Sequence, residues 1–117
     1  MRTDQERLED ILEAIERIEK YAAQGPARFQ SDELIQNWIT HHIQIIGEAC
    51  RALSPGLQKN HPEVPWAEIV GMRHILVHDY FGIDLVEVWK AVERDLPVLK
   101  SKIKTLLQSP PQNPPKK

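Results

Sequence analysis

The sequence predicts an all-α protein, built as an antiparallel bundle of four main helices. Apolar residues recur at intervals of three and four over long segments, which is the spacing of one face of an α-helix. Cap residues or proline stand where these segments begin, and no alternating strand pattern is present. We therefore expect one helical domain over residues 1–108, followed by a disordered, Pro-rich tail over residues 109–117.

The first predicted helix begins at a capping box formed by Thr3 and Glu6. It ends near Ala23, because Gly25 and Pro26 follow. Charged residues occupy the positions between the apolar ones, so the helix is amphipathic with a solvated acidic outer face. The apolar face consists of Leu8, Ile11, Leu12, Ile15 and Ile18.

The second predicted helix begins with a cap at Ser31-Asp32-Glu33 and continues to Ala52 or Leu53. Its apolar residues cover most of the circumference, which is typical of a helix buried on several sides or placed at a subunit interface. His41 and His42 interrupt the apolar positions. We interpret them as partly buried side chains bonded to backbone or carboxylate, in preference to catalytic groups.

Residues 54–65 are predicted to connect the second helix to the third, which begins at Pro65 or Trp66. The third helix carries the motif described below and ends at Phe81-Gly82. A cap at Asp84 opens the fourth helix, whose apolar spacings of three and four predict a helix-packing seam. Pro97 lies inside that seam and is expected to kink or briefly interrupt the helix.

The composition is that of an ordinary globular protein, with 27% charged and 41% hydrophobic residues. A formal charge of −2 argues against general polyanion binding, so any nucleic-acid contact must come from a local patch. Cys50 is the single cysteine, which excludes an intrachain disulfide and suits a reducing compartment. No apolar run reaches membrane length, and the N-terminus lacks an apolar signal region; we expect a soluble, cytoplasmic protein without membrane contact.

The polar residues best suited to catalysis or ligand binding lie in the stretch from Gly71 to Phe81. They form two groups, Arg73-His74 and His78-Asp79-Tyr80, and the three positions between the groups are apolar. A helix that only needed a solvated face would use Lys and Glu instead. On one straight helix Arg73 and His78 diverge by roughly 140°. Either the helix ends or unwinds near His78, or a second copy of the chain completes the site.

Three interpretations of this stretch are open from the residues alone. In the first, Arg73 and Asp79 form surface ion pairs and the histidines cap a helix end. In the second, His74 and His78 bind a metal with Asp79 or His61, although this spacing usually has an acid between the histidines. In the third, the stretch cleaves a phosphodiester without a metal.

RNA is the natural substrate for the third interpretation, because its 2′-hydroxyl supplies the nucleophile. The protein must then deprotonate that hydroxyl, stabilise charge on the phosphorus oxygens and protonate the leaving oxygen. His78 can move the proton near neutral pH, and Arg73 presents a planar fork to two oxygens. Tyr80 can bond the phosphate or stack on a base.

The pattern Arg73-x4-His78-x-Tyr80 resembles the signature of the HEPN superfamily, and specifically of the HepT-like toxins. The resemblance covers roughly residues 5–107. It is carried by Phe29 and by residues 32–36, 45–49, 53–54, 65–66, 69–73, 78–84, 88–89 and 95–97. One departure is His74, because the position after the arginine is often Asn in these relatives.

The resemblance implies a homodimeric, metal-independent endoribonuclease toxin without a cofactor. Arg73 and His78 would be its catalytic residues, in a cleft at the dimer interface, and His74 and Tyr80 would position the substrate. It also implies a partner, a minimal nucleotidyltransferase antitoxin of the MntA type, which transfers AMP from ATP to Tyr80. An alternative is a non-catalytic helical adaptor that dimerises and serves as the nucleotide-binding subunit of a nucleotidyltransferase complex.

Overall fold

The computed structural model describes the backbone of residues 2–77 and 84–108, and their side chains except those of residues 73–77. This part of the chain contains helices and no strand, which confirms the all-α class. The elements are α1 (Asp4–Ala22), α2 (Pro26–Ser31), α3 (Glu33–Ala52), α4 (Pro55–Asn60), α5 (Trp66–Val77), α6 (Leu85–Lys90), the π-helical turn η1 (Ala91–Asp95) and α7 (Leu96–Gln108). The four-helix bundle and its homodimer stay predictions.

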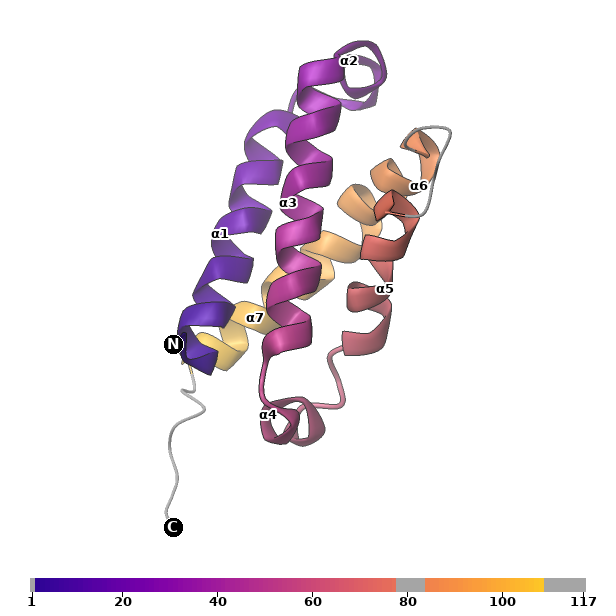
Figure 1. Ribbon diagram of the computed structural model, residues 1–117. Helices are drawn as coiled ribbons and strands as arrows, with labels where there is room; N and C mark the ends of the chain where they lie inside the picture. Colours follow the sequence, from indigo (N-terminus) through magenta and orange to yellow (C-terminus); the bar gives the residue numbers. More distant parts are fainter. Residues whose placement is uncertain (1, 78–83, 109–117) are drawn as a thin grey trace.

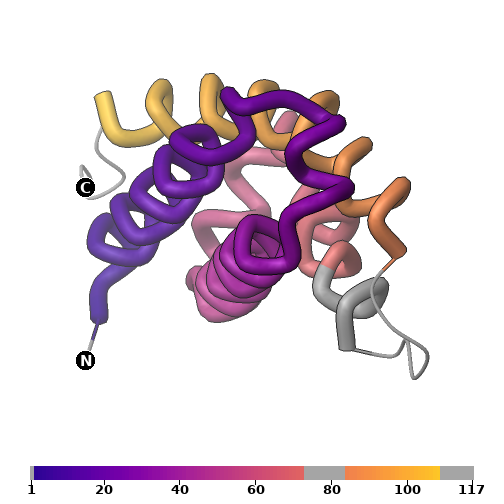
Figure 2. The backbone as a smooth tube through the Cα atoms, turned by 90° about the horizontal axis from the view of Figure 1, so that it is seen from above, coloured from indigo at the N-terminus to yellow at the C-terminus, as the bar shows by residue number. Residues whose placement is uncertain are grey.

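Helix α3 lies at the centre of the packing. It contacts α1 on one side and α5 on the other, and α7 packs against α1 (Figure 1). Neighbouring α1 and α3 run in opposite directions, as do α3 and α5. Together α6, η1 and α7 form one continuous helical path, which passes behind α3 in Figure 1 and runs along the upper side of Figure 2. The central place of α3 explains why its apolar residues cover so much of its circumference.

The core is made of aliphatic side chains that α1, α3 and α7 direct toward one another. Those below 2% exposure include Leu8, Ile11, Ile15, Ile18, Ile39, Ile46 and Ile103. On α1, the apolar positions named from sequence are fully buried except Leu12, which is partly buried. Burying such side chains stabilises the fold by about 1.5–3 kcal/mol each.

The predicted helix starts are confirmed by their cap hydrogen bonds. The Glu6 N–H donates to the Thr3 hydroxyl at 3.0 Å and the Thr3 N–H to the Glu6 carboxylate at 2.9 Å, which completes the capping box. Asp32 accepts from the backbone of Leu34 at 3.0 Å, and Asp84 accepts from that of Glu87 at 3.2 Å. These bonds satisfy N–H groups that have no partner within their helix.

Two short helices, α2 and α4, were not predicted, and residues 54–65 are therefore not a plain connection. In both, a proline stands in the first turn, where its missing N–H costs nothing. In α2 it is Pro26, which the sequence pattern marks as the end of the first helix. Gly25 precedes α2 with φ of 96°, a conformation that glycine adopts without strain. Before α4, the Ser54 hydroxyl accepts from the Leu57 N–H at 3.3 Å.

The predicted interruption near Pro97 is confirmed, and it has the form of a π-helical turn. The Leu96 N–H donates to the Ala91 carbonyl, five residues back, where an α-helix would bond four residues back. Pro97 has no N–H, and its ring would collide with the carbonyl four residues earlier in a regular helix. The wider turn relieves this collision before α7 continues.

No helix in the described ranges is both long and apolar enough to cross a membrane.

Candidate functional site

The predicted site residues divide between two situations. Arg73 and His74 belong to α5, and their side chains lie outside the described residues. His78, Asp79 and Tyr80 lie outside them altogether. The relation between Arg73 and His78 therefore stays a prediction, and so does the proposal that the helix ends or unwinds near His78.

The helix that carries the motif is firmly attached to the core at its start. The Trp66 indole N–H donates to the His61 carbonyl at 3.0 Å, and the Trp66 backbone N–H donates to the Val64 carbonyl at 2.8 Å. Ile69 and Met72, one turn apart, are buried, and α5 packs against α3. This packing fixes the direction in which α5 delivers the residues from Arg73 onward.

The chain is also anchored where it returns from the motif. Asp84 caps α6, and Val88 on that helix is 2% exposed. Trp89 packs against Phe29 with their ring centroids 5.2 Å apart. Residues 78–83 therefore connect two helices that are each held by buried side chains. Precise geometry at a reactive segment depends on this kind of rigid support.

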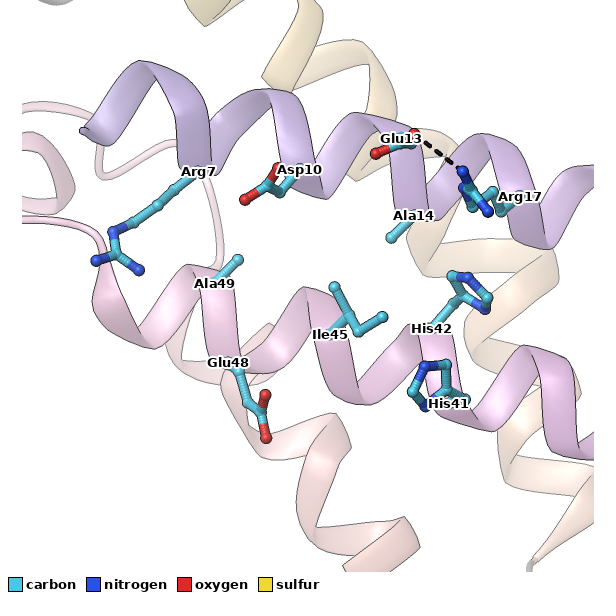
Figure 3. A pocket seen from close by; sticks show the side chains of 10 residues that line it. All are labelled: Arg7, Asp10, Glu13, Ala14, Arg17, His41, His42, Ile45, Glu48 and Ala49. Atoms are coloured by element: carbon cyan, nitrogen blue, oxygen red, sulfur yellow. Dashed lines mark hydrogen bonds and ion pairs between the residues drawn. The ribbon is translucent and has the colours of Figure 1, made fainter. Parts of the chain in front are cut away.

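A second polar region is the groove between α1 and α3, of about 480 Å³ (Figure 3). It carries both signs of charge, and much of that charge is already neutralised. Arg17 pairs with Glu13 at 3.2 Å, and Asp10 pairs with Arg2 at 2.7 Å. Its lining consists of Arg7, Asp10, Glu13, Ala14, Arg17, His41, His42, Ile45, Glu48 and Ala49. Sequence patterning gave no indication of this groove, because its two walls, residues 7–17 and 41–49, are 24 or more residues apart.

His42 is a structural residue in this groove. The residue is 5% exposed, and its ring points toward α1 in Figure 3 and lies 4.5 Å from the Trp38 ring, centroid to centroid. Nδ1 is 2.7 Å from the Trp38 carbonyl oxygen. A carbonyl only accepts, so Nδ1 carries the proton. The interpretation of a histidine bonded to backbone is confirmed for His42; for His41, which is exposed, partial burial was wrong.

Replacing His42 by alanine is expected to lower the free energy of unfolding by about 1–3 kcal/mol, because the buried ring and its bond to Trp38 are lost. His41→Ala is the matched control and should change it by no more than about 0.5 kcal/mol. Urea denaturation monitored by circular dichroism measures both. Equal stability of the two variants would contradict the structural role of His42.

The metal interpretation is not tested by the described side chains. Among them, no group of three His, Cys, Asp or Glu residues is placed to hold a metal ion. His61, one suggested ligand, is 3.1 Å from Glu63 through Nδ1. A hydrogen bond from its own backbone and the contact with His61 lower the pKa of the exposed Glu63 carboxyl. Burial raises the pKa of the Cys50 thiol to about 12, so it stays protonated and a poor ligand.

Comparison with known proteins shows which family the chain resembles. Residues 11–106 match the model of a family described as "Ribonuclease HepT-like". "Probable ribonuclease HepT" of Thermococcus cleftensis is 40% identical over 106 residues, which span 90% of this chain and 96% of that protein. "Putative RNase MJ1380" of Methanocaldococcus jannaschii is 36% identical, over 82% of this chain and 89% of its own. "Putative RNase TTE0752" of Caldanaerobacter subterraneus is 34% identical, over 92% and 97% respectively. No solved structure gives a significant match.

Proposed function

The chain belongs to the HepT-like ribonuclease family, and from this premise we propose that it is a metal-independent endoribonuclease whose active site is the Arg73-x4-His78-x-Tyr80 motif. The proposal rests on one observation: the region that matches the ribonuclease family contains the motif. The match covers residues 11–106 and so includes the whole motif. The position of the motif, between helices held by Trp66 and Val88, supports the proposal.

The reaction needs no nucleophile from the protein. His78 accepts the proton of the RNA 2′-hydroxyl, and the 2′-oxygen forms a bond to phosphorus. The bond from phosphorus to the 5′-oxygen breaks, and the His78 imidazolium returns its proton to that oxygen. A 2′,3′-cyclic phosphate remains. Arg73 stabilises the charge that gathers on the phosphorus oxygens. His74 positions the scissile phosphate.

We further propose a homodimer whose subunits share the site. Arg73 and His78 diverge by roughly 140° on one straight helix, so a two-fold axis beside the motif would let one copy supply the guanidinium and the other the imidazole. Mixing an Arg73→Ala chain with a His78→Ala chain tests this. In a shared cleft, mixed dimers regain one intact site, whereas two self-contained sites would stay inactive.

The biological role that we propose is that of the toxin in a cytoplasmic toxin–antitoxin pair. The antitoxin is a minimal nucleotidyltransferase of the MntA type. The Tyr80 phenol oxygen attacks the α-phosphorus of ATP, pyrophosphate leaves, and the phenolic proton goes to solvent. The attached AMP places a phosphate beside Arg73, where the substrate phosphate would bind, and so inhibits cleavage.

Tyr80→Phe should abolish AMP transfer while most of the ribonuclease activity survives, because the ring remains and only the acceptor oxygen is lost. Intact-mass spectrometry after incubation with the transferase and ATP measures the transfer. AMP found on another residue would contradict the assignment of Tyr80.

The decisive experiment is incubation of AMP-free protein with total RNA, with and without EDTA. Cleavage in EDTA that ends in 2′,3′-cyclic phosphates is expected. Loss of cleavage with EDTA would favour a metal site at His74 and His78. Absence of cleavage under both conditions would leave the helical adaptor of a nucleotidyltransferase complex.

A further inference from the structure

A second groove, distinct from the one in Figure 3, lies where the end of α3, α4 and the start of α5 meet. It measures about 570 Å³ and is lined by Arg51, Gln58, Lys59, Trp66, Ala67 and Val70. Figure 1 shows α4 below the adjoining ends of α3 and α5. The groove exists because α4 turns the chain back between these two helices.

The walls of this groove are held by specific bonds. The Gln58 side-chain amide donates to the carbonyls of Cys50 at 3.2 Å and Leu53 at 3.0 Å, which ties α4 to the end of α3. Ser54 donates through its backbone N–H and its hydroxyl to the Asp4 carboxylate, at 3.0 and 2.6 Å. Trp66 forms one wall and is 8% exposed. The groove is therefore a fixed feature of the surface.

The charge of the groove is positive on a chain whose formal net charge is −2. Arg51 and Lys59 are exposed, and no carboxylate is among the lining residues. Within the described ranges, neither cation takes part in an ion pair. Other cations do, namely Arg2, Arg17, Arg28, Lys90 and Lys100. This is the local basic patch that binding of a polyanion requires.

The groove adjoins the motif along α5. Val70 follows Ala67 by three positions, and position 74 follows Val70 by four, so these positions share one side of the helix. Along the axis, position 74 lies about 6 Å beyond Val70. A chain of phosphates bound at the motif could continue into the groove without leaving this side of the helix.

We infer that this groove binds the phosphodiester backbone of the RNA substrate beside the scissile phosphate. The inference rests on the proposed ribonuclease function. Arg51 offers a guanidinium fork and Lys59 an ammonium, and both suit phosphate oxygens. The Trp66 ring is too buried, and its N–H already bonded, for it to stack on a base. Binding here therefore depends on charge and not on base sequence.

The test compares the wild-type protein with the double variant Arg51→Gln/Lys59→Gln. The probe is a single-stranded 2′-O-methyl RNA, which lacks the attacking hydroxyl and is bound without being cut. Fluorescence anisotropy over a series of salt concentrations gives the slope of log affinity against log salt. The variant slope should be shallower by roughly 0.7 per lost phosphate contact, about 1.4 in all, for every base sequence tried.

Lys20→Gln/Lys104→Gln is the matched control, because it removes the same charge from exposed lysines that do not line the groove. Its slope should equal that of the wild type. If the slope of the control variant became shallower by the same amount, net charge alone would explain the weaker RNA binding, and the inference would be overturned. An unchanged slope in the groove variant would also overturn it, and would be the result if the groove served an acidic protein partner.

The same experiment separates this inference from the proposed function. If the wild-type protein cleaves RNA and the groove variant binds RNA normally, the ribonuclease proposal stands and the inference about the groove is excluded. A wild-type protein that binds RNA without cleaving it would end the ribonuclease proposal, and the two slopes would still decide the groove. Absence of RNA binding by the wild type would overturn both.

Discussion

Replacing His78 by alanine is expected to lower RNA cleavage by roughly 10²- to 10⁴-fold, because the group that moves the proton from the 2′-hydroxyl is removed. Initial rates on a defined RNA at saturating substrate measure the loss. Arg73→Ala should approach the same loss, since a positioned charge donor contributes roughly 10²- to 10³-fold. Expression of either variant should no longer arrest growth, whereas the wild type without its transferase should.

The control for these variants is the fold itself. Circular dichroism and the urea midpoint of His78→Ala should match those of the wild type, so that a lost rate reports chemistry and not unfolding. Retained cleavage by a folded His78→Ala protein would defeat the mechanism. So would cleavage that needs His74 and a divalent cation but does not need Arg73.

Replacing Ile46 by alanine is expected to lower the free energy of unfolding by about 2–5 kcal/mol. Ile46 has no exposed surface and lies on α3, the helix that packs against both α1 and α5. The truncated side chain leaves a cavity in a close-packed core, which the surrounding side chains fill only in part. Urea denaturation at one fixed protein concentration measures the loss, since any dimer makes stability depend on concentration.

Leu34→Ala, on the same helix, is the matched control. Leu34 is 80% exposed, so its truncation should change the free energy of unfolding by no more than about 0.5 kcal/mol. A loss at Leu34 as large as that at Ile46 would show that this exposed leucine is buried against another chain. Equal and small losses at both would contradict the central position of α3.

The sequence alone determined the helical class and the starts of three long helical segments. The predicted caps are confirmed at Thr3, Asp32 and Asp84. Caps can be predicted from sequence because a cap side chain bonds to N–H groups only two or three residues away. The turn before Pro97 was equally predictable, since proline removes its own N–H wherever it stands. The motif was found in the same way, by residue types and spacing.

Only the tertiary structure decided which distant residues meet. Prolines at 26 and 55 have the same chemistry whether they end a helix or begin one, and here packing makes them begin α2 and α4. The Asp4 carboxylate reaches Ser54, 50 residues away, and α4 brings Lys59 into one groove with Arg51. Local sequence patterns do not predict such contacts, because the contacts depend on how whole helices pack.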